Sequence, residues 1–266
     1  MAERRFDRPR LAVVKVGSNS LRGPDGRLDR DQIRVVVDGI AAARTSATDL
    51  VLVSSGAVAA GLGQLGLDTR PGDMDTLQSA ASVGQGQLIH AYQRDFAEHG
   101  LICGQVLLTQ DDFVRRGRYL NARRTLRKLL ELGAVPVVNE NDVVATEELA
   151  YGDNDHLAAL VASMLEAEVL LLLSDVGGLY EVDPRHTPGA TLIDRVDDLD
   201  RLAQLRIGGT GSFVGSGGMR SKVEAARVAV LSACHAVIAD ARRPGVIPDA
   251  LAGEPIGTWF VAQPKR

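Results

Sequence analysis

The chain has 266 residues, of which 45% are hydrophobic and 24% are charged, so it can form one large domain or two small ones with a substantial core. Its formal net charge of −4 includes no basic excess, and no basic amphipathic stretch is present, which argues against a nucleic-acid or membrane-surface partner. The N-terminus is too polar for a signal peptide, and no apolar run approaches the ~20 residues of a membrane span. The two cysteines are isolated in the sequence and suggest neither disulfides nor a metal site. We therefore expect a soluble cytoplasmic protein.

The first predicted strand contains a lysine within an otherwise apolar run. Residues 11–20 read LAVVKVGSNS, an apolar run interrupted by Lys15 and followed by a turn that begins at Gly17. Because burying an unpaired ammonium group is costly, the lysine needs a partner or access to solvent. A lysine beside a glycine-led turn with free N–H groups is suited to phosphate binding. An ordinary strand whose lysine extends to the surface is the alternative.

The following elements alternate between helix and strand. Residues 29–44 carry apolar side chains at helical spacing, and residues 49–53 predict a second strand. The turn from Ser54 through Ser55 to Gly56 then leads into a helix of small residues. This order is the βαβ pattern of a parallel sheet.

A long helix and a third strand come next. Residues 76–99 predict a helix that is broken or loosened near Gly84 and Gly86, and residues 102–108 predict the strand. The polar, arginine-rich residues 109–119 are interpreted as an exposed loop or lid. A solvated charged surface is the alternative for this segment.

Two polar clusters flank the middle of the chain. After a helix at residues 120–132, the strand at residues 135–138 is followed by NEND at residues 139–142, which has more side-chain oxygens than a plain turn needs. The sequence GDND at residues 152–155 then opens a helix with a regular apolar face. Asp and Asn cap helices, but three in succession exceed what one cap requires. Both clusters are therefore candidates for ligand binding.

The last third of the chain adds two more candidate segments. A strand at residues 169–173 ends in Ser174 and Asp175, and a glycine-rich stretch leads into a helix that begins at Met219. Lys222 falls in the first turn of that helix, where the macrodipole disfavours a cation. An anion bound by both the lysine and the helix N-terminus would explain its position.

The polar strand ends are expected to meet. In an open parallel sheet the carboxyl ends of the strands line one crevice, where ligands bind. Residues 236–239 and 257–262 predict the closing strands of this sheet. The sequence therefore predicts a single site, whereas purely structural polar residues would be scattered over both ends of the sheet.

Six segments occur in a fixed order along the chain: VVKVGSNSL, LVSSGAVAAG, VNENDVVAT, YGDNDHLAALVA, LLLSDVGGLYEVDPR and GSGGMRSKVEAA. Together they resemble the amino-acid kinase superfamily and, within it, the glutamate 5-kinase family, over roughly residues 10–262. The resemblance implies a three-layer α/β/α sandwich around a largely parallel open sheet. It implies one domain over residues 1–266, with a glutamate-binding part at roughly 10–165 and an ATP-binding part at roughly 166–262.

The resemblance also implies an activity. ATP, with Mg²⁺ held mainly through its phosphates, would phosphorylate the side-chain carboxylate of L-glutamate to give glutamyl 5-phosphate and ADP, the first step of proline biosynthesis. Proline would act as a feedback inhibitor, and the chain would assemble as a homo-oligomer, a dimer or tetramer. Many bacterial members continue into a C-terminal domain that resembles RNA-modifying enzymes, and we expect a form without it because the chain ends at Arg266.

Position by position, the resemblance assigns three kinds of residue. Lys15 and Lys222 would act on the transferring phosphoryl group, and the carboxylate of Asp155 would orient these two lysines. Those binding glutamate would be Ser55, Asn139, Asp142 and Asn154. Those binding ATP would be Lys15, Gly17, Ser174, Asp175, Ser216, Gly217, Gly218, Met219, Arg220, Ser221 and Lys222.

Other functions remain open. Another acid or phosphate kinase of the superfamily would share most of these residues, and a non-catalytic sensor could bind an amino acid or a nucleotide on the same fold. A dinucleotide-dependent dehydrogenase is disfavoured because the first strand leads into KVGSNS rather than G-x-G-x-x-G, and no acidic residue ends the second strand.

Overall fold

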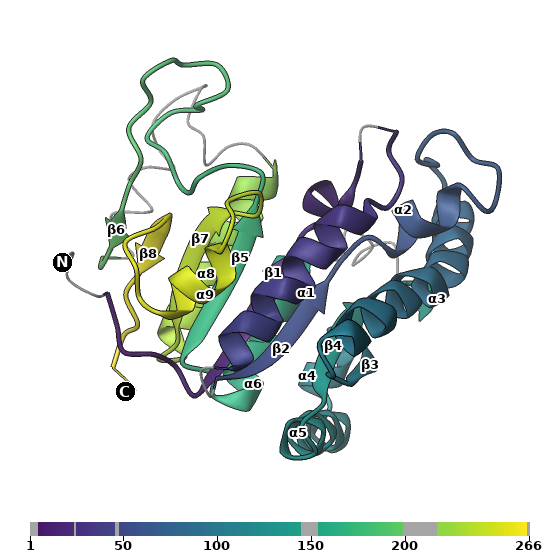
Figure 1. Ribbon diagram of the computed structural model, residues 1–266, viewed down its shortest axis with the longest axis horizontal. Coiled ribbons are helices and arrows are strands. Elements are labelled where there is room, and N and C mark those ends of the chain that lie inside the picture. Colours follow the sequence, from purple (N-terminus) through teal and green to yellow (C-terminus); the bar gives the residue numbers. More distant parts are fainter. Residues whose placement is uncertain (1–4, 24, 46–47, 145–153, 199–216, 265–266) are drawn as a thin grey trace.

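The computed structural model describes residues 5–23, 25–45, 48–144, 154–198 and 217–264. Within these residues one sheet is formed by β1 (Leu11–Val16), β2 (Asp49–Ser54), β3 (Cys103–Leu108), β4 (Val135–Glu140), β5 (Val169–Ser174), β6 (Arg195–Val196), β7 (His235–Asp240) and β8 (Thr258–Phe260). Their order is β3-β4-β2-β1-β5-β7-β8-β6, which runs from right to left in Figure 1. Strands β1 to β5 and β7 are parallel, whereas β8 is antiparallel to β7, and β6 pairs in parallel with β8.

Helices cover both faces of this sheet. They are α1 (Arg30–Arg44), α2 (Ala57–Leu62), α3 (Met74–Glu98), α4 (Asp111–Val114), α5 (Arg116–Glu131), α6 (Asn154–Leu165), α8 (Gly217–Leu231) and α9 (Val246–Leu251), with short 3₁₀ turns η1 (Ser18–Leu21) and η2 (Asp142–Val144). Alternate side chains of β5 enter different cores: Leu170 and Leu172 pack with α5, α6 and α8, while Leu171 and Leu173 pack with α1, α3 and α9. The expected three-layer α/β/α sandwich around a largely parallel sheet is confirmed.

The central strands are apolar because neither face is exposed to water. All residues of β1 from Ala12 to Val16 are buried, and β5 is buried along its whole length. A parallel strand covered by helices on both sides is a continuous apolar run rather than an alternating pattern. Lys15 is the exception in β1, and its position near the carboxyl end of the strand brings it to the edge where ligands bind.

Helix α3 is continuous, so the expected break near Gly84 and Gly86 is wrong. A side-chain Cβ at Gly84 would collide with the carbonyl oxygen of Ala57 and the backbone nitrogen of Gly61 in α2. A Cβ at Gly61 would in turn collide with the carbonyl oxygen of Ala80 in α3. The absence of side chains thus allows α2 and α3 to pack backbone against backbone.

Residues 109–119 are mainly helical, so the expectation of an exposed loop is also wrong. The segment forms α4 and the first turn of α5. Asp112 accepts hydrogen bonds from the backbone N–H of Thr109 at 2.7 Å and from its hydroxyl at 2.9 Å, and Asp111 pairs with Arg115 at 2.7 Å. Most of these charged side chains face solvent and pair locally, which agrees with the alternative of a solvated charged surface.

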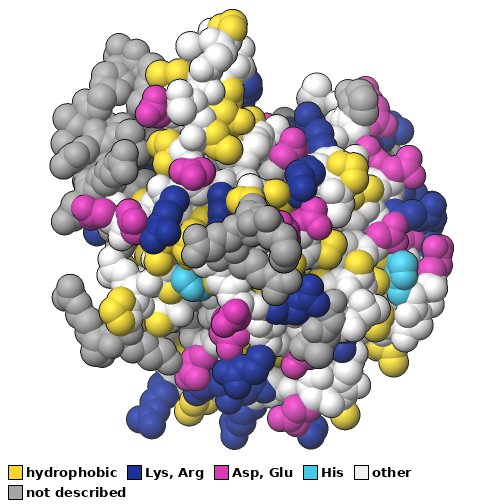
Figure 2. Space-filling model, turned by 60° about the vertical axis from the view of Figure 1, so that its left-hand side comes forward, with side chains coloured by type: hydrophobic (Ala, Val, Ile, Leu, Met, Phe, Trp, Pro, Cys, Tyr) yellow, Lys and Arg dark blue, Asp and Glu magenta, His cyan; other side chains and the backbone are white. Residues whose placement is uncertain are grey.

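The outer surface carries charges of both signs. On the face shown in Figure 2, acidic and basic side chains are interspersed rather than segregated. Among the helices of the described residues, none has both the length and the apolar character needed to cross a membrane.

Candidate active site

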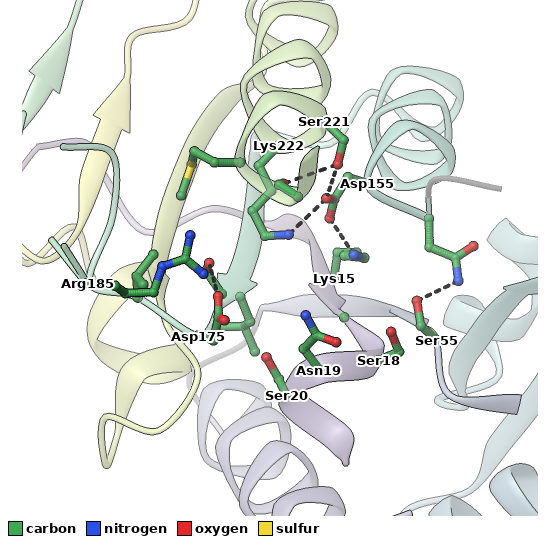
Figure 3. A pocket seen from close by; sticks show the side chains of 17 residues that line it. Lys15, Ser18, Asn19, Ser20, Ser55, Asp155, Asp175, Arg185, Ser221 and Lys222 are labelled. Atoms are coloured by element: carbon green, nitrogen blue, oxygen red, sulfur yellow. Dashed lines mark hydrogen bonds and ion pairs between the residues drawn. The ribbon is translucent and has the colours of Figure 1, made fainter. Parts of the chain in front are cut away.

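The carboxyl ends of the central strands meet as expected. Strand β1 lies between β2 and β5, and Val16 is level with Ser54 on one side and with Leu173 on the other. A polar cavity of about 400 Å³ opens at this edge, and its wall includes residues from β1, η1, β5, α6 and α8 (Figure 3). Lys15 and Lys222, which are far apart in the sequence, both line it.

A buried carboxylate joins the two lysines. The Lys15 Nζ lies 2.5 Å from Asp155 Oδ1, and the Lys222 Nζ lies 2.9 Å from Asp155 Oδ2, so the lysines approach from two sides (Figure 3). The Ser221 hydroxyl donates to Asp155 Oδ2 at 2.8 Å. The exposed fractions are 4% for Lys15, 1% for Asp155 and 8% for Lys222, so all three charges are withdrawn from water.

These contacts keep Asp155 ionised. Burial alone would raise the pKa of Asp155, but the positive charges of Lys15 and Lys222 and their hydrogen bonds lower it to about 2. One carboxylate therefore faces two ammonium groups, which leaves a surplus positive charge at the cavity wall. Such a surplus in a water-poor site favours an anion that carries several charges, such as a polyphosphate.

Most residues assigned to ATP line this first cavity. They are Lys15, Gly17, Ser174, Asp175, Gly218, Met219, Ser221 and Lys222. Arg220 is exposed and is not part of the cavity wall, and Gly217 begins α8. Ser216 lies outside the described residues.

A second polar cavity, of about 120 Å³, adjoins the first. The two share Ser18, Ser55 and Asn154. Asn139 and Asp142 also line the second cavity, so the four residues assigned to glutamate come together there. The Asn154 Nδ2 donates to the Ser55 hydroxyl at 2.8 Å and to Asn139 Oδ1 at 2.9 Å.

Asp142 lies in an environment that opposes its charge. Burial raises the pKa of this carboxyl group, and the positive charge of Arg70 counteracts the rise. A cationic group of a bound ligand would stabilise the ionised carboxylate further. The second cavity is therefore suited to a ligand that has both cationic and anionic groups.

Several arginines of the two cavities were missed by sequence reasoning. Arg185 lies across the first cavity from Lys222, beside Asp175 (Figure 3), and Asp183 holds its guanidinium through hydrogen bonds at 3.0 and 2.8 Å. Arg22 and Arg70 line the second cavity. The sequence DPR at residues 183–185 is visible as a turn, but only the structure shows that this turn brings Arg185 to the first cavity.

At the carboxyl edge of a largely parallel sheet, Lys15 of β1 and Lys222 of α8 line a cavity suited to a polyphosphate, and a second cavity suited to a small zwitterion adjoins it. These features define a kinase that transfers a phosphoryl group to a small molecule. Comparison with known proteins makes this more specific. Residues 10–240 match the amino acid kinase family.

Two curated glutamate 5-kinases illustrate the relationship. The enzyme of Salinispora arenicola is 52% identical over 97% of this chain and 69% of its own length. The enzyme of Streptomyces coelicolor is 51% identical over 97% of this chain and 68% of its own length. This chain thus spans about two thirds of these relatives. It belongs to the amino acid kinase family and, within it, to the glutamate 5-kinases.

A solved structure with little sequence similarity shares the fold. Carbamate kinase from Giardia lamblia bound to AMP-PNP superposes with a TM-score of 0.70 at 15% identity, covering 95% of this chain and 98% of that one. At this identity the likeness concerns the fold alone.

Proposed function

We propose that this chain transfers the γ-phosphoryl group of ATP to the side-chain carboxylate of L-glutamate, giving glutamyl 5-phosphate and ADP, the first step of proline biosynthesis. The observation that carries the proposal is the buried group of Lys15, Asp155 and Lys222 in the wall of the first cavity, which adjoins the second at Ser18, Ser55 and Asn154. The first cavity would hold the nucleotide and the second would hold glutamate. The family to which the chain belongs supports the choice of both substrates.

The residues can support this reaction without a general base. A carboxylate acceptor is already ionised at neutral pH, because the usual pKa of a glutamate side chain is about 4.3. Phosphoryl transfer depends mainly on positioning and on neutralisation of charge. Lys15 on β1 and Lys222 on α8 would neutralise the phosphoryl oxygens from two sides, and Asp155 would hold both lysines in place. Mg²⁺, bound mainly through the ATP phosphates, would neutralise further charge.

The placement of the cavity residues supports two functional parts within one domain. The second cavity is lined by residues between Ser18 and Asn154, which agrees with a glutamate-binding part at roughly 10–165. Nine of the residues that line the first cavity lie between Leu173 and Lys222, within the proposed ATP-binding part at roughly 166–262, and eight lie between Lys15 and Asp155. Lys15 and Gly17 belong to the first part of the chain but line the nucleotide side, so the boundary passes between neighbouring strands of one sheet.

The proposal predicts ADP release that depends on both glutamate and Mg²⁺. A coupled assay with glutamate, aspartate and acetylglutamate in parallel would measure it. Turnover should be clearly highest with glutamate. Equal turnover with acetylglutamate would indicate another acid kinase, and nucleotide binding without any turnover would indicate a sensor.

A substitution at Asp142 should separate substrate binding from chemistry. We expect Asp142→Ala to raise KM for glutamate by roughly ten- to a hundred-fold, the scale of a lost hydrogen bond to a charged group. The kcat should change little, because the contact with the α-ammonium group would be present in the ground and transition states alike. Asp111→Ala, which removes an exposed carboxylate of α4, is the control. A loss confined to kcat would contradict this role for Asp142.

Proline should inhibit the enzyme in competition with glutamate. It keeps the α-carboxylate and the cationic nitrogen that Asn139, Asp142 and Asn154 would bind, but it lacks the side-chain carboxylate that accepts the phosphoryl group. Initial rates at varied glutamate, with and without millimolar proline, would show a raised KM and an unchanged maximal rate. A maximal rate that falls at saturating glutamate would contradict a shared site.

Two further parts of the proposal concern the chain as a whole. We propose self-association, which is supported by apolar side chains exposed on and next to β3 and β4, among them Ile102, Leu107, Val143 and Val144. Strand β3 ends the sheet, and an edge strand is a common place for contact with another chain. A cytoplasmic location stays a prediction from the sequence.

A further inference from the structure

A row of side-chain amides runs from α3 to the second cavity. The Gln85 Oε1 accepts a hydrogen bond from Asn139 Nδ2 at 2.7 Å, and Asn139 Oδ1 accepts one from Asn154 Nδ2 at 2.9 Å. Asn139 and Asn154 are buried, with exposed fractions of 2% and 7%, whereas Gln85 is half-buried on α3. The three amides thus connect the surface of a helix with the wall of the proposed glutamate site.

Main-chain groups determine which end of each asparagine amide points which way. The backbone N–H of Glu140 donates to Asn139 Oδ1 at 2.9 Å, so this atom must be the oxygen and the NH₂ group must point to Gln85. The Asn154 NH₂ group donates to the carbonyl oxygen of Ser54 at 3.0 Å, which can only accept. The side-chain oxygen of Gln85 is the acceptor for the NH₂ group of Asn139.

The orientation of Asn154 leaves one buried acceptor, its Oδ1, without a hydrogen-bond partner among the described residues. A buried polar atom without a partner is unfavourable, and a native site usually supplies that partner from a ligand or from water. Asn154 lines both cavities, so the place of its side chain shapes the wall that a bound amino acid would contact.

We propose that Gln85 is a positioning residue for the amino-acid substrate. It accepts a hydrogen bond from the NH₂ group of Asn139, and Asn139 in turn accepts one from the NH₂ group of Asn154, so that both asparagines keep their places in the wall of the second cavity. Without the Gln85 oxygen, the NH₂ group of Asn139 loses its acceptor, and the Asn139 side chain is held in place by fewer hydrogen bonds. This inference rests on the proposed function, because it concerns the glutamate site.

Gln85→Met tests the inference, because methionine keeps the size and helix preference of glutamine but offers no comparable acceptor. We expect KM for glutamate to rise about ten-fold, the scale of one unsatisfied buried polar group. The kcat should stay within about two-fold, because the charges proposed to act on the phosphoryl group belong to Lys15 and Lys222. The KM for ATP should rise less than the KM for glutamate, because Gln85 and Asn139 lie outside the wall of the first cavity. Gln87→Met, an exposed glutamine on the same helix, is the matched control and should behave as the wild type.

A double-mutant cycle separates positioning from a general effect on structure. If Gln85 acts through Asn139, Gln85→Met should change KM for glutamate by less than about two-fold in an Asn139→Ala background. Thermal melting should show similar unfolding midpoints for Gln85→Met and Gln87→Met.

Three results would overturn the inference: an unchanged KM for glutamate in Gln85→Met, an equal rise in both KM values, or loss of folding in Gln85→Met alone. A full additional effect in the Asn139→Ala background would also overturn it. A wild-type enzyme without glutamate-dependent turnover would instead refute the proposed function itself. The wild type, assayed in parallel, therefore distinguishes the two failures.

Discussion

Replacement of Asp155 by asparagine is expected to cause the largest loss of activity, a fall in kcat of about two to three orders of magnitude. Asparagine keeps one oxygen but removes the negative charge that holds Lys15 at 2.5 Å and Lys222 at 2.9 Å. The two lysines would then repel each other and lose their alignment on the phosphoryl group. The magnitude is that of losing a preorganised electrostatic group, and the KM for glutamate should change less than kcat.

The same substitution should also reduce the free energy of unfolding. Removal of one partner from a buried ion pair typically costs about 3–5 kcal/mol, because the remaining charge stays buried without compensation. Denaturant unfolding of Asp155→Asn would measure this loss. The control is Asp111→Asn, whose ion pair with Arg115 is exposed and should contribute little. A kcat close to the wild type would contradict the orienting role of Asp155.

Lys222→Met is expected to lower kcat by at least about a hundred-fold, again on the scale of one electrostatic group acting on the transition state. The sequence alone suggests little effect on folding, since a cation in the first turn of a helix is unfavourable. The structure corrects this expectation: α8 begins at Gly217, so Lys222 is its sixth residue and does not lie in its first turn. Lys222 is also buried and paired with Asp155. A moderate loss of stability is expected, smaller than for Asp155→Asn, because Lys15 still compensates the carboxylate.

Steady-state kinetics of Lys222→Met would be compared with Lys128→Met. Lys128 is an exposed lysine of α5 that pairs with Glu131 at 3.0 Å, so its loss should leave kcat unchanged. The double variant Lys222→Met with Asp155→Asn should lose less activity than the product of the single losses, because groups that act as a unit are not additive. Near-normal kcat in Lys222→Met would show that this lysine does not act on the phosphoryl group.

The two corrections to the predicted elements have different causes. Gly84 weakens a helix by propensity, and this effect alone suggested a break. The close packing of α2 against α3 outweighs propensity, because a side chain at Gly84 would collide with the backbone of Ala57 and Gly61. In residues 109–119, local contacts such as that of Asp112 with Thr109 favour a helix start, and the high charge of the segment obscured this signal.

The sequence by itself determined the sheet, its largely parallel character and the polar strand ends. The reason is that apolar strand runs, glycine-led turns and helix starts are local patterns, and parallel strands bring their carboxyl ends to one edge. It also determined that Lys15 is unusual, since a buried strand disfavours an unpaired cation. Lys222 was singled out on the expectation of a helix that begins at Met219, whereas α8 begins at Gly217.

Only the tertiary structure decided what these residues contact. Asp155 lies 67 positions from Lys222, and Gln85 lies 54 positions from Asn139, so neither pairing is visible as a local pattern. Arg185 likewise lines the first cavity only because the turn that carries it returns to this edge of the sheet. Such contacts depend on the packing of whole elements, because a side chain's partner is set by how helices and strands meet in space and not by its neighbours in the chain.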